Sequence, residues 1–181
     1  MNVAMDIFLL DSNTLIEPSK KFYSFRIAPG FWTFLQNEIF DGNILVIDVV
    51  AKEISKGRDT LADWLDETNV VPLDRRSPDI LTGYTKVLNY VHQNSAYSDR
   101  ALALWSDSSH ADPWIVAFAI ARGCTVITFE QPNTSLGTSQ TSKPKIPDVC
   151  SAFGVNCINL FQFLDIRNFS FPTHTDSFHD L

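Results

Sequence analysis

Residues 7–17 read IFLLDSNTLIE, so that one aspartate, Asp11, directly follows four apolar residues. Three short polar side chains come next: Ser12, Asn13 and Thr14. A short apolar run that stops at polar residues is typical of a buried β-strand. The stretch therefore predicts a strand over residues 5–10. This strand either ends in a simple turn or delivers the Asp11 carboxylate to a working site.

The bulk composition predicts one folded globular domain. The chain has 181 residues, of which 45% are hydrophobic, and no apolar run approaches the ~20 residues that span a bilayer. We expect the domain over residues 1–167 and a flexible tail over residues 168–181. The N-terminus lacks the features of a signal peptide, and the three cysteines stand in apolar contexts. Both observations predict reduced thiols and a cytoplasmic protein without a membrane partner.

Strand and helix patterns alternate along the chain. Apolar runs predict further strands at 44–48, 69–73 and 124–129, and a last strand within 156–164. Helical spacing predicts helices at 30–40, 49–57, 59–67, 78–91, 100–107, 112–122 and 147–154. Residues 18–30 and 131–145 are predicted as loops. This alternation predicts an α/β layer fold with a central, mostly parallel sheet.

Four carboxylates are predicted at the edge of the sheet where active sites form, outside the carboxyl ends of the strands. Asp11 ends the first strand and Glu130 ends the strand at 124–129. Glu53 lies in the helix after the second strand, and Asp112 heads the helix that leads into 124–129. Asp48 also follows a strand, where we predict a helix cap.

Each acid also has a plain structural interpretation. Asp112 precedes a proline, as an N-cap residue often does, and His110 beside it is predicted as a surface histidine. Glu53 could pair with a nearby lysine or arginine, and Glu130 could be an exposed acid at a strand end. Acids crowded together raise one another's pKa, and a divalent cation commonly relieves this repulsion. Oxygen ligands suit Mg²⁺ or Mn²⁺.

Three segments carry a resemblance to a known family: FLLDSNTLIE (8–17), VIDVVAKEISKG (46–57) and ADPWIVAFAIARGCTVITFE (111–130). They resemble the PIN-domain nucleases, most closely the VapC-like toxins of toxin–antitoxin pairs. The segments APGFWTFL (28–35) and KIPDVCSAFGVNCINL (145–160) resemble a toxin-like subgroup of PIN proteins. The sequence contains no GxxxxGK[ST], GxGxxG, HExxH or GxSxG motif that would point to another enzyme class.

The resemblance implies a three-layer α/β/α PIN-like fold and a metal-dependent endoribonuclease. It implies RNA as the substrate and a cognate antitoxin as the partner. By position, it makes Asp11, Glu53 and Asp112 ligands of Mg²⁺ or Mn²⁺, with Glu130 as a fourth acid. Hydrogen bonds from Asn13, with Ser12 or Thr14, are expected to fix the first carboxylate. The candidate phosphate contacts are Lys52, Lys56, Arg58, Lys143 and Lys145.

The sequence departs from the commonest PIN pattern, because Glu130 stands where aspartate is usual and Asp112 precedes a proline. A non-catalytic PIN-like module that binds RNA or protein is therefore an alternative. The net charge of −7 also favours this alternative slightly, since it argues against broad adhesion to nucleic acid. A haloacid-dehalogenase-like phosphatase is a weaker third hypothesis, because Asn13 stands where that family needs a second aspartate. Aromatic surface candidates at Trp32, Tyr90 and Trp105 would allow a homodimer.

Overall fold

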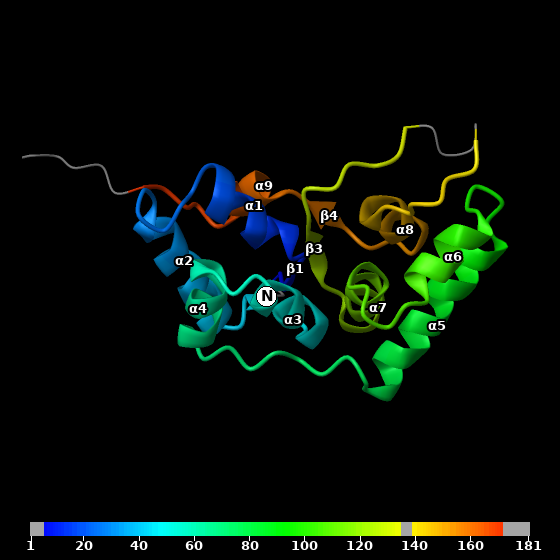
Figure 1. Cartoon of the computed structure of the whole chain (residues 1–181), viewed down its shortest axis with the longest axis horizontal. Helices are drawn as coiled ribbons and strands as arrows, with labels where there is room; N and C mark the ends of the chain where they lie inside the picture. The colour runs from blue at the N-terminus through cyan, green and yellow to red at the C-terminus, as the bar shows by residue number, and fades with distance from the viewer. Residues whose placement is uncertain (1–5, 135–138, 172–181) are drawn as a thin grey trace, which may run out of the picture.

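The computed structural model describes residues 6–134 and 139–171, and its elements form a mixed α/β architecture (Figure 1). Four strands build one sheet in the order β2-β1-β3-β4. Their bounds are β1 (Phe8–Leu10), β2 (Ile44–Leu45), β3 (Thr125–Ile127) and β4 (Cys157–Ile158). All three pairings are parallel, and Leu9 of β1 lies opposite Leu45 on one side and Val126 on the other. All three residues of β1 are buried, as expected for the inner strand of a parallel sheet.

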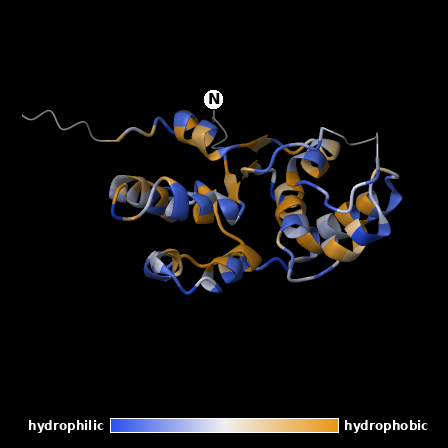
Figure 2. Ribbon diagram, turned by 45° about the horizontal axis from the view of Figure 1, so that its top comes forward, coloured by the Kyte–Doolittle hydropathy of each residue, from blue (hydrophilic) through white to orange (hydrophobic). Residues whose placement is uncertain are grey.

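Helices cover both faces of this sheet. Those of the described residues are α1 (Asn13–Lys21), α2 (Pro29–Phe40), α3 (Asp48–Ser55), α4 (Thr60–Glu67), α5 (Pro78–Gln93), α6 (Asp99–Trp105), α7 (Asp112–Arg122), α8 (Ile146–Ala152) and α9 (Leu160–Ile166). In Figure 1, α1, α2 and α9 lie on one side of the strands, and α5, α7 and α8 lie on the other. Hydrophobic residues gather on the strands and on the helix faces that pack against them (Figure 2). The predicted three-layer α/β/α fold with a parallel sheet is confirmed.

Helix α1 is an element that the sequence patterns do not predict. It starts at Asn13, two residues after Asp11, and runs through the first part of the predicted loop at 18–30. Pro18 lies inside it, although proline removes a backbone donor from a helix. Thr14, Leu15 and Pro18 are all buried. Burial of this face therefore outweighs the unfavourable helix propensity, and the chain turns directly from β1 into a helix at Asp11.

The segment 69–73, predicted as a short strand or an edge segment, contributes an isolated parallel bridge between Leu73 and Ile47. The predicted helix cap at Asp48 is wrong. Asp48 is the first residue of α3 and makes no capping hydrogen bond; its carboxylate instead lies 3.3 Å from Lys52 Nζ and 3.5 Å from Arg75 Nη1.

The described part of the chain contains no helix that is both long and apolar enough to cross a bilayer.

Two of the three aromatic residues predicted as a dimer surface are buried within the chain. Trp32 and Trp105 are buried, whereas Tyr90 is half-buried and packs against Tyr97 and Phe153. The surface prediction is therefore wrong for Trp32 and Trp105.

The start of the predicted tail also makes contacts within the domain. Phe169 packs against Phe31 and Phe34, and Phe171 packs against Tyr23. The remainder of the predicted tail, 172–181, lies outside the described residues.

Helix α7, which begins at Asp112, is deeply buried. Its residues 113–119 are all buried, and α5 packs closely against it. The rings of Tyr84 and Trp114 stack at 3.8 Å between the two helices. Gly83 allows this close approach, because a Cβ atom added there would lie 2.8 Å from the carbonyl oxygen of Ala117. This contact sets the position of α7 and therefore the position of Asp112 at its start.

Gly83→Ala should destabilise the fold by about 1–3 kcal/mol, because the added methyl overpacks the α5–α7 contact. Alanine is favoured over glycine by about 1 kcal/mol in an exposed helix, so propensity alone predicts the opposite sign. The measurement is the free energy of unfolding in urea, with the exposed Thr85→Ala on the same helix as the control. A Gly83→Ala protein at least as stable as the wild type would show that the two helices can separate at little cost.

Candidate active site

Four carboxylates line one cavity of about 320 Å³ at the carboxyl edge of the sheet. We call this cavity the acidic pocket; its lining consists of Asp11, Ser12, Asn13, Glu53, Lys56, Ser109, His110, Ala111, Asp112 and Glu130. Parallel strands end at the same edge of a sheet, which brings the residues after β1 and β3 together. Helix α3 leaves the sheet at this edge, and α7 begins there before it returns to β3. The four acids therefore come from four separate segments.

Asp11 is the most buried of the four acids, with 2% of its surface exposed. Burial raises the pKa of its carboxyl from 3.8 to about 7, with a further contribution from the negative charge of Asp112. A hydrogen bond from Thr128 Oγ1 to Asp11 Oδ2, 2.9 Å long, opposes this shift, while Glu130 and Glu53 add to it. Asp11 has no ion-pair partner among the described residues, so its charge at neutral pH is poorly compensated.

The polar residues after Asp11 take roles that differ from the prediction. Ser12 Oγ donates a hydrogen bond to Glu53 Oε2 at 3.0 Å, and Thr14 Oγ1 donates to the main-chain oxygen of Asp11. Asn13 is exposed and lines the pocket. Among the described residues, the hydrogen bond to the Asp11 carboxylate comes from Thr128, and the expectation that Asn13 supplies it is corrected. The signal for Thr128 was a single hydroxyl residue at the end of an apolar strand, two positions before Glu130.

Glu53 and Asp112 are each held by one neighbour rather than by the partners of their plain interpretations. Among the described residues, Glu53 accepts a side-chain hydrogen bond from Ser12. Asp112 makes no capping hydrogen bond at the start of α7; its Oδ2 atom lies 3.0 Å from Nε2 of His110. His110, predicted as a surface residue, lines the pocket and is half-buried. The hydrogen bond to Asp112 raises the pKa of His110, which favours its charged form beside the acids.

Glu130 is the acid that is most completely neutralised. Its Oε1 atom accepts a hydrogen bond from Lys145 Nζ, and its Oε2 atom accepts one from the main-chain N–H of Ile146 at 2.8 Å. Its own N–H donates to Thr128 Oγ1 at 3.1 Å. The bond with Glu130 also raises the pKa of Lys145. One threonine therefore links the Glu130 backbone to the Asp11 carboxylate.

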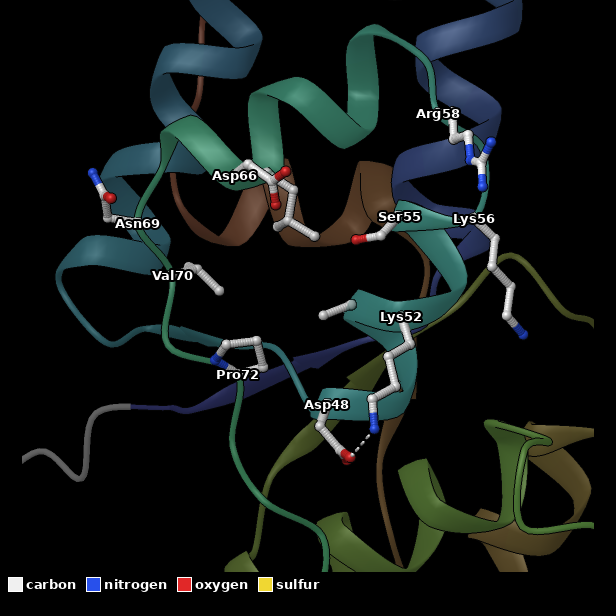
Figure 3. A pocket seen from close by; sticks show the side chains of 11 residues that line it. Asp48, Lys52, Ser55, Lys56, Arg58, Asp66, Asn69, Val70 and Pro72 are labelled. Atoms are coloured by element: carbon white, nitrogen blue, oxygen red, sulfur yellow. Dashed lines mark hydrogen bonds and ion pairs between the residues drawn. The ribbon is translucent and has the colours of Figure 1, made fainter.

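A second cavity, of about 840 Å³, adjoins the acidic pocket and contains part of the predicted phosphate-binding set (Figure 3). We call it the basic groove after its three cations, Lys52, Lys56 and Arg58, of which Lys56 lines both cavities. The rest of its lining is acidic, polar and apolar: Asp48, Ala51, Ser55, Leu65, Asp66, Asn69, Val70 and Pro72. Figure 3 shows Lys52 turned toward Asp48, while Lys56 extends away from Val70 and Pro72. Lys143 is exposed, and Lys145 pairs with Glu130. The structure thus brings two of the five predicted cations, Lys56 and Lys145, to the four acids.

The acidic pocket suits a hard metal ion by its chemistry. Among the described residues, no three side chains of His, Cys, Asp or Glu lie together in a way that could hold a metal ion. Glu53, Asp112 and Glu130 are each held by a neighbour, as described above. Oxygen atoms dominate the donors, however, and the buried Asp11 carboxylate lacks a compensating charge. Glu53 is exposed, and these carboxylates offer the kind of oxygen donor that Mg²⁺ and Mn²⁺ prefer.

A family model described as a domain of unknown function, DUF4411, matches residues 8–171. The chain belongs to the DUF4411 family. The matched span begins at the first residue of β1 and includes every residue that lines the acidic pocket. No curated protein and no solved structure matches this DUF4411 chain.

Replacement of Asp11 by asparagine should stabilise the protein at alkaline pH in the presence of a chelator. The folded protein holds the Asp11 proton more tightly than the unfolded chain, because the pKa rises from 3.8 to about 7 on folding. The stability from this proton is full below pH 3.8 and is lost as the pH rises through about 7. Asp11→Asn should therefore gain on the order of 2–4 kcal/mol over the wild type between these limits.

The measurement is urea unfolding from pH 4 to pH 8, with the exposed Asp41→Asn as the matched control. A constant difference between Asp11→Asn and the wild type across this range would contradict the burial of a charged Asp11.

Proposed function

We propose that this DUF4411 chain is a metal-dependent endoribonuclease of the PIN type. The observation that carries the proposal is that Asp11, Glu53, Asp112 and Glu130, from four separate segments, line one cavity at the carboxyl edge of a parallel sheet. Structural acids serve their own helices and loops and have no reason to meet in one cavity. The resemblance of the surrounding segments to PIN nucleases supports the same reaction: hydrolysis of a phosphodiester bond in RNA.

Asp11, Glu53 and Asp112 would hold the Mg²⁺ or Mn²⁺ ion. When bound, such an ion lowers the pKa of a water nucleophile and offsets the charge that develops on the phosphodiester. Thr128 fixes the orientation of the Asp11 carboxylate, and Ser12 holds Glu53 beside the pocket. His110 lies against Asp112, with Nε2 3.0 Å from Oδ2, and its charged form limits the repulsion between this acid and Asp11. These contacts pre-arrange the carboxylates before substrate binds.

Recognition of the RNA backbone is local rather than global in this proposal. The chain carries a net charge of −7, so long-range attraction to RNA is unfavourable. Lys56 is the cation best placed for a phosphate, since it lies at the junction of the acidic pocket and the basic groove. Arg58 lines the groove next to it and can contact a neighbouring phosphate.

A role as the toxin of a type II toxin–antitoxin pair follows from the VapC-like resemblance. In this role, a cognate antitoxin would inhibit the enzyme by placing a basic segment in the acidic pocket. An arginine side chain suits such a segment, because its guanidinium group forms paired hydrogen bonds with carboxylates.

Purified protein should cleave structured RNA with Mn²⁺, and a chelator should abolish the cleavage. Asp11→Asn and Asp112→Asn should each lower the rate by about 100-fold or more, since each removes a carboxylate that would hold the metal ion. The exposed Asp63→Asn on α4 is the control and should cleave as the wild type does. Cleavage that resists the chelator, or that survives in both variants, would refute the metal nuclease. Binding of RNA without cleavage in any metal would identify a non-catalytic module instead.

Lys56→Ala should raise the KM for RNA about threefold to tenfold and leave kcat nearly unchanged, because it removes one phosphate contact. The slope of log KM against log salt should decrease by about 0.7–0.9, as expected for the loss of one ionic contact. The matched control is Lys86→Ala, at an exposed position on α5 outside both cavities. Equal effects of the two variants would show that Lys56 acts only through the net charge of the chain.

A further inference from the structure

Lys145 forms an ion pair with Glu130 and so places a positive charge next to an acid that lines the acidic pocket. Both Glu130 carboxylate oxygens are engaged, one by the Lys145 ammonium and the other by the Ile146 N–H at 2.8 Å. The two donors come from adjacent residues at the start of α8, immediately before Pro147. Ile146 is fully buried, so its N–H cannot move away from Glu130 without disturbing the core.

Release of Glu130 to bind a metal ion would be unfavourable. The carboxylate would have to give up a charged partner and a backbone donor at once. The Ile146 N–H would then remain buried without an acceptor, which is unfavourable. The Asp11 carboxylate, by contrast, accepts a hydrogen bond only from the Thr128 hydroxyl among the described residues. The carboxylates of Asp11 and Glu130 therefore differ in their contacts: Glu130 is paired with a cation and a main-chain N–H, whereas Asp11 has no charged partner among the described residues.

Lys145 also lies within the electrostatic influence of the other acids. Its ammonium interacts with Asp112 as well as with Glu130. Its side chain remains about one-third exposed, with 38% of its surface accessible to solvent. The cation is therefore anchored at one end of the site and still open to an incoming anion.

We infer that Lys145 is a catalytic residue that supplies the second positive charge of the site in place of a second metal ion. Its ammonium contacts a non-bridging oxygen of the RNA phosphate, and Glu130 positions it without binding metal. This inference rests on the proposed ribonuclease function. It implies that each chain binds one divalent ion. It also accounts for glutamate in place of aspartate at 130, because the longer side chain reaches the start of α8.

The test combines Mn²⁺ titration by calorimetry with RNA cleavage, on the full chain. The wild type should bind one Mn²⁺. Glu130→Gln should keep the Mn²⁺ Kd within about twofold, and Lys145→Met should keep it or tighten it, since a nearby positive charge is lost. Lys145→Met should nevertheless lower kcat about 100-fold, as expected for the loss of a group that stabilises developing charge. Lys145→Arg should restore part of the rate, and the control Lys86→Met, at an exposed position on α5 outside both cavities, should match the wild type.

Two results would overturn the inference. A tenfold or greater loss of Mn²⁺ affinity in Glu130→Gln would make Glu130 a metal ligand, and wild-type cleavage by Lys145→Met would remove the lysine from the reaction. Thermal melting of each variant separates these effects from unfolding. Failure of the wild type to cleave any RNA would refute the proposed function, whereas the Mn²⁺ titrations would still decide whether Glu130 binds metal.

Discussion

The burial of one carboxylate, that of Asp11, constrains the whole site. Strand β1 carries it out of the core at the centre of the sheet, where the surroundings are apolar and the other acids are near. A single hydrogen bond from Thr128 is its direct stabilising contact among the described side chains. The folded protein therefore holds an acid with a pKa of about 7 at the position where a parallel sheet usually binds ligands. Carboxyl groups with such strongly raised pKa values are often found at functional sites.

Around this acid, the topology sorts the remaining charges into two groups. Glu53 and Asp112 are held by neutral or titratable neighbours, Ser12 and His110. Glu130 is held by Lys145 and by the rigid start of α8. An ion on one side and an ammonium on the other would surround a phosphate with positive charge while the chain as a whole stays acidic. Under the proposed function, this separation would allow a protein of net charge −7 to act on a polyanion.

The site depends on packing far from the acids as well. Helix α7 presents Asp112 at the correct edge because its body is buried against the sheet and against α5. That close packing requires a residue without a side chain at Gly83. On the opposite face, Phe163 of α9 packs against Phe8 of β1 at 5.0 Å, so the strand that carries Asp11 is held from both sides.

Local patterns were sufficient to predict the parallel α/β fold and the four acids, because apolar strands, helical spacing and acids at strand ends are properties of short segments. They failed at α1, where burial of Thr14 and Leu15 outweighs the effect of Pro18. They also failed at Trp32 and Trp105, whose burial depends on distant helices. Local sequence patterns also could not predict which residues contact the acids. Thr128 and Asp11 are 117 positions apart, and Lys145 reaches Glu130 across a loop. Only the folded chain decides which carboxylate is paired with a cation and which remains open.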